Sequence, residues 1–227
     1  MLELLLRDCY TEPAAFIMEG RCRNQKEMRE SIFRDVFRRP TAEDYIEEAR
    51  KAAVYINTRR VQTPHGLVWS LEDARTYLSN YYDEICMYAG STGIAHFYVQ
   101  LYEATGEKNY LEDAREAARY IIWRWDHKRD LAKCFSKYAF TTGYGGVAVF
   151  LDELYQLTGE EEYRRVIFEI AEAAMADAIP EEDGEGYSWG SYPGVVGDGS
   201  AILLLLKLGR EFEQPRWREF ALRAGRY

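Results

Sequence analysis

Cysteine and histidine side chains are the first residues of this sequence that could do chemistry, because together they are ligands that Zn²⁺ prefers. The four cysteines are widely spaced and form no CxxC pair. This usage predicts isolated buried thiols in a reduced, cytoplasmic protein. We expect Cys86 to be a small buried residue and His96 to be a hydrogen-bonded core or cavity histidine. A zinc site would need ligands from scattered positions: Cys86, Cys134, His65, His96 and His127.

Carboxylates are the second group, since two of them facing a cavity could hydrolyse a glycosidic bond. We expect the adjacent Asp83 and Glu84 to point in different directions, and Asp198 to cap a helix that begins at Gly199–Ser200. No pair stands out among the candidates: Asp83, Glu84, Asp183, Glu185 and Asp198.

Aromatic residues beside glycine-rich turns are the third group, and with Asp198 they form our candidate substrate-binding set: Trp69, Tyr88, Tyr144, Trp189 and Tyr192. The alternative is that these rings anchor loops. The sequence has no Walker loop, no Rossmann fingerprint and no Ser-His-Asp elbow. No catalytic residue is therefore assigned.

An internal repeat positions these residues. The stretch TGYGGVAVFLDELYQLT (142–158) opens on glycines, continues as an apolar helix and breaks at Thr158-Gly159. The same order occurs 53 residues earlier, from Gly90 and Gly93 to Gly106, and less cleanly at 194–209. A fixed period of this kind indicates a repeat architecture.

A second, amphipathic helix follows each break. YLEDAREAARYI (110–121) matches YIEEARKAAVYI (45–56) at eight of twelve positions, and its apolar residues have helical spacing. The repeat unit is thus a helical hairpin in an all-α protein. Predicted inner helices are 93–105, 146–158 and 199–209; predicted outer helices are 42–58, 109–125, 160–178 and 214–226.

The remaining segments predict one repeat domain, 41–227, preceded by an appendage, 1–40, with helices near 2–19 and 25–37. Thr41 and Asp44 form an approximate capping box, and Pro215 suits a first helical turn. PHGLVWS (64–70) predicts a turn with an outward glycine and an anchoring Trp69, and DGEGYSW (183–189) resembles it. Both loops are expected to follow an outer helix and precede an inner one. A short helix is expected near 71–82.

The net charge of −9 argues against nucleic acid or an anionic membrane as a partner. The opening LELLLR is too short for a signal peptide or a membrane span.

These repeats resemble the lanthionine synthetase C-like family, most strongly in YAGSTGIAHFYVQLYEATG (88–106) and TTGYGGVAVFLDELYQLTG (141–159). The resemblance covers roughly 41–227 and implies a partial α/α toroid, with inner helices around a cavity and outer helices around them. It also implies a peptide or small molecule in the central cavity as the expected ligand.

The family's chemistry is the addition of cysteine thiols to dehydrated serine or threonine in peptides. The resemblance implies zinc held by two cysteines and a histidine, where one cysteine follows a tryptophan and the other belongs to a Cys-His pair. This sequence has neither a Trp-Cys nor a Cys-His dipeptide. No cofactor is therefore expected, and the chain is expected to be non-catalytic alone or part of a longer enzyme.

Two alternatives stay open. Six-hairpin glycosidases share the toroid and the TG-x-x-x-Y-L pattern, so a carbohydrate-active enzyme of that type is one. A helical-repeat interaction module is the other.

The number of hairpins raises a question of partners. About three and a half hairpins cannot close a ring that needs six or seven hairpins. The leucines of SAILLLLKLG (200–209) would then be partly exposed to solvent. Since fully burying one leucine stabilises a fold by roughly 1.5–3 kcal/mol, we expect a homodimer or a missing C-terminal half to cover them.

Overall fold

The computed structural model describes residues 40–69, 83–128, 136–182, 186–190, 194 and 196–226. The chain divides into two compact units, Met1–Tyr45 and Ile46–Tyr227. The fold below is that of the second unit, together with the start of the helix that crosses the boundary. The helices expected near 2–19, 25–37 and 71–82 lie outside the described residues.

The described residues are mostly helical, which confirms the all-α class. Each predicted inner and outer helix is present, with ends within a few residues of those expected. The helices are α4 (Ala42–Asn57), α6 (Ser91–Thr105), α7 (Lys108–His127), α8 (Tyr144–Thr158), α9 (Glu161–Ala176), α10 (Asp198–Glu211) and α11 (Pro215–Ala224). No helix in the described ranges has the length and apolar character that crossing a membrane requires.

Two predicted helix starts are confirmed. At α4 the Asp44 N–H donates to Thr41 Oγ1, and the Thr41 N–H donates back to Asp44 Oδ2 at 2.7 Å. This reciprocal pair is a capping box, with aspartate in the place of the usual glutamate. At α11, Pro215 occupies the first helical turn, where its missing N–H costs no intrahelical bond.

The Thr-Gly breaks end α6 and α8 in the same way. Gly106 and Gly159 have φ of 74° and 71°, and each donates its N–H to the carbonyl four residues earlier. Thr105 Oγ1 donates to the Leu101 carbonyl at 2.6 Å, as Thr158 Oγ1 does to that of Leu154 at 2.7 Å. Glycine adopts a positive φ without the steric penalty that a Cβ would cause. The chain therefore turns sharply, and α7 and α9 pack against the helices before them.

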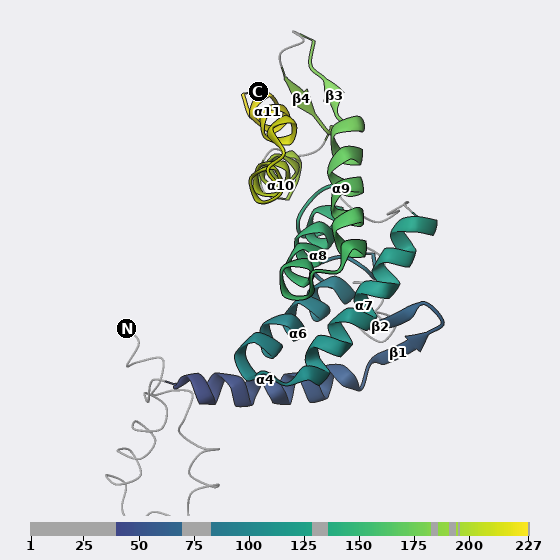
Figure 1. The fold of residues 1–227 in the computed structure, drawn as a ribbon, viewed down its shortest axis with the longest axis vertical. Coiled ribbons are helices and arrows are strands. Elements are labelled where there is room, and N and C mark those ends of the chain that lie inside the picture. The colour runs from purple at the N-terminus through teal and green to yellow at the C-terminus, as the bar shows by residue number, and fades with distance from the viewer. Residues whose placement is uncertain are drawn as a thin grey trace, which may run out of the picture. The chain divides into compact units, whose positions relative to one another are not determined.

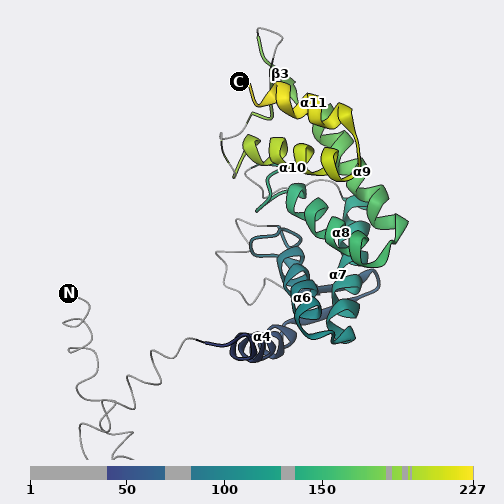
Figure 2. The ribbon, with the colours of Figure 1, turned by 60° about the vertical axis from the view of Figure 1, so that its left-hand side comes forward.

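Helix pairs α6–α7, α8–α9 and α10–α11 follow one another along the chain, and α8 lies between α6 and α10 (Figures 1 and 2). One hydrophobic cluster runs through all three pairs. Its largest fully buried members include Tyr98, Ile121, Phe150, Leu151 and Trp217. Side chains of α6, α8 and α10 supply much of it, which explains why these helices lack a clear polar face.

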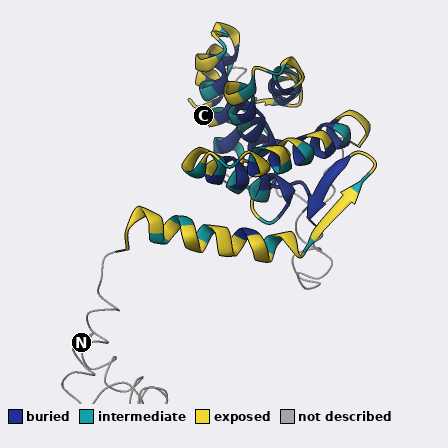
Figure 3. Cartoon of the chain, turned by 60° about the horizontal axis from the view of Figure 1, so that its bottom comes forward, coloured by how far each residue is buried: buried dark blue, intermediate teal, exposed yellow. Residues whose placement is uncertain are grey.

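Two short antiparallel hairpins were not predicted. The first joins β1 (Arg60–Thr63) to β2 (Gly66–Trp69), and the second joins β3 (Ile179–Pro180) to β4 (Tyr187–Ser188). As expected, each lies between two helices, after α4 or α9 and before α6 or α10. β2 is buried and β1 is largely exposed (Figure 3).

Gly66 corrects the expectation of an outward glycine. It is buried, with φ of 128°, and a Cβ there would lie 2.3 Å from the Glu116 carbonyl oxygen of α7. The glycine permits both the backbone conformation and the close approach of β2 to α7. Trp69 is buried, as its predicted anchoring role requires.

Candidate functional site at the glycine turns

The loops that precede α6 and α8 share one hydrogen-bond pattern. Ser91 N–H donates to the Glu84 carbonyl at 2.7 Å, and Tyr144 N–H, 53 residues later, donates to that of Lys137 at 2.8 Å. The turns closed by the N–H groups of Gly90 and Gly143 match in the same way. The Tyr88 N–H also donates to the Thr141 carbonyl at 2.8 Å. Equivalent positions of the two loops are thus bonded to each other, so the starts of α6 and α8 lie side by side.

The starts of these helices require glycine for steric reasons, because a side chain would clash with the preceding loop. A Cβ at Gly93 would lie 2.0 Å from the Met87 carbonyl oxygen, and one at Gly146 would lie 2.2 Å from that of Phe140. At Gly199, near the start of α10, a Cβ would lie 2.7 Å from the Gly194 carbonyl oxygen. Real Cβ atoms do not approach backbone oxygens so closely, so the loop folds over the first helical turn only where the side chain is absent.

Trp69 and Tyr144, two residues of the candidate binding set, are buried. The Trp69 ring stacks on Tyr98 with centroids 5.5 Å apart, and its backbone N–H donates to Ser91 Oγ at 3.1 Å. Tyr144 begins α8 and meets the Trp125 ring edge to face at 4.7 Å. Both rings anchor the starts of α6 and α8 from within the core. Tyr88, by contrast, is 65% exposed.

Trp189 and Asp198 come together at the third turn. The Trp189 backbone N–H donates to Asp198 Oδ2 at 2.9 Å, and Trp189 Nε1 donates to the Ala174 carbonyl at 2.7 Å. Asp198 is the first residue of α10, whose N-cap is Gly197, so the prediction that Asp198 caps this helix is wrong. Its carboxylate fixes the loop after β4 instead. Tyr192, Asp183 and Glu185 lie outside the described residues.

Arg124 of α7 binds both carboxylates that were expected to diverge. Its guanidinium donates to Asp83 Oδ2 at 3.0 Å and to Glu84 Oε1 at 2.6 Å. The Tyr120 hydroxyl donates to the same Glu84 oxygen at 2.5 Å. Burial, followed by this bond to Glu84, raises the pKa of Tyr120 to about 12. The expectation for Asp83 and Glu84 is therefore wrong, because one long, buried cation reaches both.

Polar pairs also join α6 to α8 and α8 to α10. His96 Nδ1 of α6 lies 2.6 Å from Glu153 Oε2 of α8, which confirms that His96 is hydrogen-bonded. The bond to Glu153 raises the pKa of His96, although partial burial opposes it. Lys207 of α10 donates to the buried Asp152 of α8 and, at 2.5 Å, to Glu211. Sequence spacing alone could not pair His96 with Glu153 or Lys207 with Asp152, because the partners are on different helices.

Cys86 is buried, as expected, and its sulfur accepts a hydrogen bond from the Ala89 N–H at 3.4 Å. Burial raises the pKa of the thiol, which disfavours the nucleophilic thiolate. Over the described ranges, no three His, Cys, Asp or Glu side chains gather closely enough to hold a metal ion.

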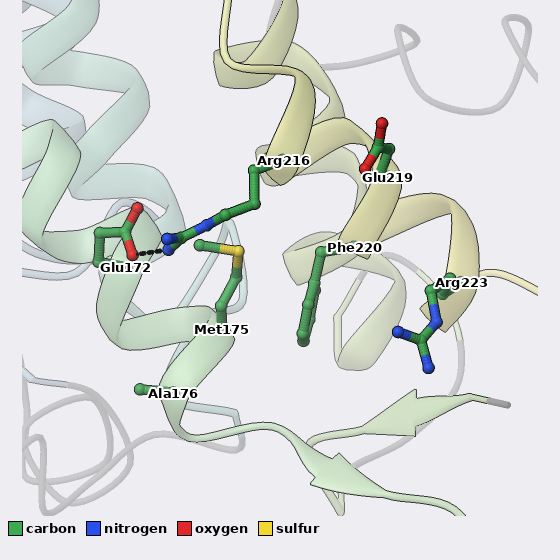
Figure 4. A pocket seen from close by; sticks show the side chains of 7 residues that line it. All are labelled: Glu172, Met175, Ala176, Arg216, Glu219, Phe220 and Arg223. Atoms are coloured by element: carbon green, nitrogen blue, oxygen red, sulfur yellow. Dashed lines mark hydrogen bonds and ion pairs between the residues drawn. The ribbon is translucent and has the colours of Figure 1, made fainter. Parts of the chain in front are cut away.

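A pocket of ≈ 400 Å³ lies between helices α9 and α11 (Figure 4). Met175 and Phe220 supply apolar walls, and Arg216 reaches across to Glu172. The Phe220 ring stacks on Tyr187 of β4, with centroids 4.3 Å apart. Its lining groups make ion pairs and apolar contacts between α9 and α11, and the seven lining residues place no nucleophile beside a base.

A second pocket of ≈ 270 Å³ occupies the matching place between α7 and α9. Its residues Arg119, Ile122 and Trp123 are offset by one repeat from Glu172, Met175 and Ala176, which line the first pocket. The ring of His65, near the tip of the first hairpin, stacks on Trp123 with centroids 4.0 Å apart. Sequence reasoning did not single out Trp123, because it lies off the apolar stripe of its helix; in the structure it is half-buried. Both pockets are grooves that the repeat itself produces.

No protein-family model and no curated protein shows a significant match to this chain. The candidate site is therefore defined by geometry alone. It consists of the glycine turns before α6 and α8, where Tyr88 is exposed and Trp69 and Tyr144 are buried.

Proposed function

We propose that this chain is an α/α-toroid protein of the lanthionine synthetase C-like type that binds a peptide at its glycine turns without forming thioether rings on its own. The observation that carries the proposal is the Tyr88–Thr141 hydrogen bond between equivalent positions of two matching loops. A backbone bond of this kind holds the start of one hairpin against the start of the next, which suits repeated units that contact their neighbours.

The polar groups near the turns favour binding over catalysis. Asp83 and Glu84 are both engaged by Arg124, and His96 is engaged by Glu153. A glycosidase needs one protonated and one ionised carboxyl group aimed at the sugar. Two carboxylates that share one buried guanidinium are poorly suited to that division of roles, so the glycosidase is the weaker proposal.

The test uses the full chain and a fluorescent peptide that contains one cysteine and one dehydroalanine. We expect saturable binding by fluorescence anisotropy, less than stoichiometric zinc by elemental analysis, and no loss of free peptide thiol by alkylation. Thiol addition leaves the peptide mass unchanged, so the thiol count is the decisive measurement. Zinc-dependent loss of the thiol would show a cyclase, and absence of binding would remove the proposed role.

A matched pair of variants locates the site. Tyr88 and Tyr55 are both 65% exposed, but Tyr55 lies on α4 and not in a glycine turn. Tyr88→Ala is expected to weaken peptide binding at least about fivefold, since a lost aromatic contact costs about 1 kcal/mol or more. Tyr55→Ala should bind as the parent chain does. Equal effects of both changes would contradict the location.

A further inference from the structure

The groove between α7 and α9 and the groove between α9 and α11 are equivalent in the repeat, but aromatic rings fill them differently. The offset of 53 residues places Ala176 of α9 at the position of Trp123 of α7. In the first groove the Trp123 ring is half-buried, and the His65 ring stacks on it with centroids 4.0 Å apart. The second groove has a methyl group at that position. A ring is thus present in one groove and missing from the equivalent place in the other.

An ion pair of the first groove also has no counterpart at the equivalent positions of the second. Arg165 of α9 donates to both carboxylate oxygens of Asp126 on α7, at 3.0 and 3.1 Å. Helices α9 and α11 align at their N-caps with an offset of 54 residues, so Glu219 stands where Arg165 does. Ile179 of β3, which stands where Asp126 does, has an alkyl side chain and is 54% exposed. The second groove is the larger, at ≈ 400 Å³ against ≈ 270 Å³.

The walls of the second groove suit an aromatic ring. Met175 of α9 and Phe220 of α11 supply apolar walls beside Ala176 (Figure 4). A thioether and an aromatic ring both attract a further ring. The Phe220 ring is held in place by its stack on Tyr187, with centroids 4.3 Å apart. The volume of this groove is within the range of small-molecule sites.

The charges that line the second groove balance one another. Two carboxylates and two guanidinium groups line it: Glu172, Glu219, Arg216 and Arg223. Arg216 forms an ion pair with Glu172, and the Arg223 guanidinium lies over the Tyr187 ring at 4.9 Å. Because neither sign is in excess, a charged ligand would lose water without gaining a net attraction. The ligand that complements this groove is therefore an uncharged ring.

We propose that the groove between α9 and α11 binds an aromatic residue of a peptide, an indole above all, in the place that Trp123 takes in the preceding groove. The bound ring packs against Met175 and Phe220 and covers Ala176. The chain itself supplies the template, because it holds one indole at the equivalent position beneath His65. The groove shares no lining residue with the glycine turns, so this proposal does not depend on peptide binding there.

Methyl NMR of the full chain, with isotope-labelled methionine methyl groups, tests the proposal. Added N-acetyl-tryptophan amide is expected to shift the Met175 signal saturably, with a dissociation constant on the order of 1 mM, because one buried ring must also offset its lost freedom of motion. The Met87 signal, from the first glycine turn, should stay in place. N-acetyl-leucine amide should bind at least about fivefold more weakly, since it offers no ring to Phe220.

A matched pair of variants locates the bound ring. Ala176→Trp supplies the missing ring from the chain itself, so it should weaken probe binding at least about tenfold. Ala52 of α4 is exposed, as Ala176 is, but it does not line the groove. Ala52→Trp is therefore the control, and it should bind the probe as the parent chain does.

Several outcomes would overturn the proposal. These are an unshifted Met175 signal up to about 10 mM probe, equal binding of the leucine amide, and unchanged binding in Ala176→Trp. A shift at Met87 in place of Met175 would put the ring at the glycine turns instead. Probe affinity that falls as the chain is concentrated would show that a second copy occupies the groove.

Discussion

At the scale of single residues, the polar groups of this molecule act mainly between elements. Arg124 ties α7 to the loop before α6, and His96 ties α6 to α8. The Arg124 side chain is only 10% exposed, so its partners must compensate for the loss of water around the charge. Such groups fix which element lies beside which.

The His96–Glu153 pair predicts a pH dependence of stability. Because the pKa of His96 is raised in the folded chain above its ordinary value of 6.5, its stabilising effect is complete below that value and is lost as pH rises through the raised pKa. The side chains are 35% and 29% exposed, so screening keeps the effect below about 1 kcal/mol.

Urea unfolding near pH 6 and near pH 8.5, on either side of the ordinary histidine pKa, measures this effect. The change in unfolding free energy between the two pH values should be smaller in His96→Gln than in the parent chain. An unchanged pH dependence in the variant would assign it to other groups.

At the scale of elements, the glycine turns and Thr-Gly breaks determine where helices begin and end. Gly159 ends α8 through its positive φ, whereas Gly146 near the start of α8 is needed for space. The two glycines therefore respond differently to the same substitution, although alanine is the better helix former.

Gly146→Ala is expected to destabilise the fold by about 3 kcal/mol, because the new Cβ would meet the Phe140 oxygen at 2.2 Å and Met87 Cβ at 2.7 Å. Gly159→Ala is the matched control. It places a Cβ in open space at a φ of 71°, so its cost should be about 1 kcal/mol. Chemical denaturation measures both, and equal losses would contradict the steric argument.

Features set by local sequence signals could be predicted, whereas contacts between residues far apart along the chain could not. Helices were predictable because glycine spacing and apolar periodicity are local signals. The turn at 64–65 was predicted, but the strands beside it were missed because RVQT and GLVW are four residues each, too short for an alternating pattern to indicate a strand. At the site, burial of Trp69 followed from its type, but the joint binding of Asp83 and Glu84 depends on Arg124, which is 41 and 40 residues away along the chain.

At the scale of the whole described molecule, stability should vary with how many sides of each helix pair are covered. The pair α8–α9 has α6–α7 on one side and α10–α11 on the other, whereas α10–α11 packs against a helix pair on one side. Repeat proteins distribute stability between such units and their shared interfaces.

Hydrogen exchange should therefore be slower in the amides of α8 and α9 than in those of α10 and α11, because opening the terminal pair exposes a single shared interface to water. Peptide-resolved mass spectrometry of the full chain measures this difference. Equal protection across all these helices would mean that the unit unfolds in a single cooperative step.

The matching loops before α6 and α8 also bear on how such a chain tolerates mutation. Their shared bonds are made by backbone atoms, while the side chains differ: Asp83 and Glu84 stand where the second loop has Ser136 and Lys137. The loop geometry therefore constrains the glycines most directly, whereas the side chains that differ between the two loops serve local contacts, as Asp83 and Glu84 do with Arg124. Over time, two copies of such a unit would keep their spacing while losing their residue identity.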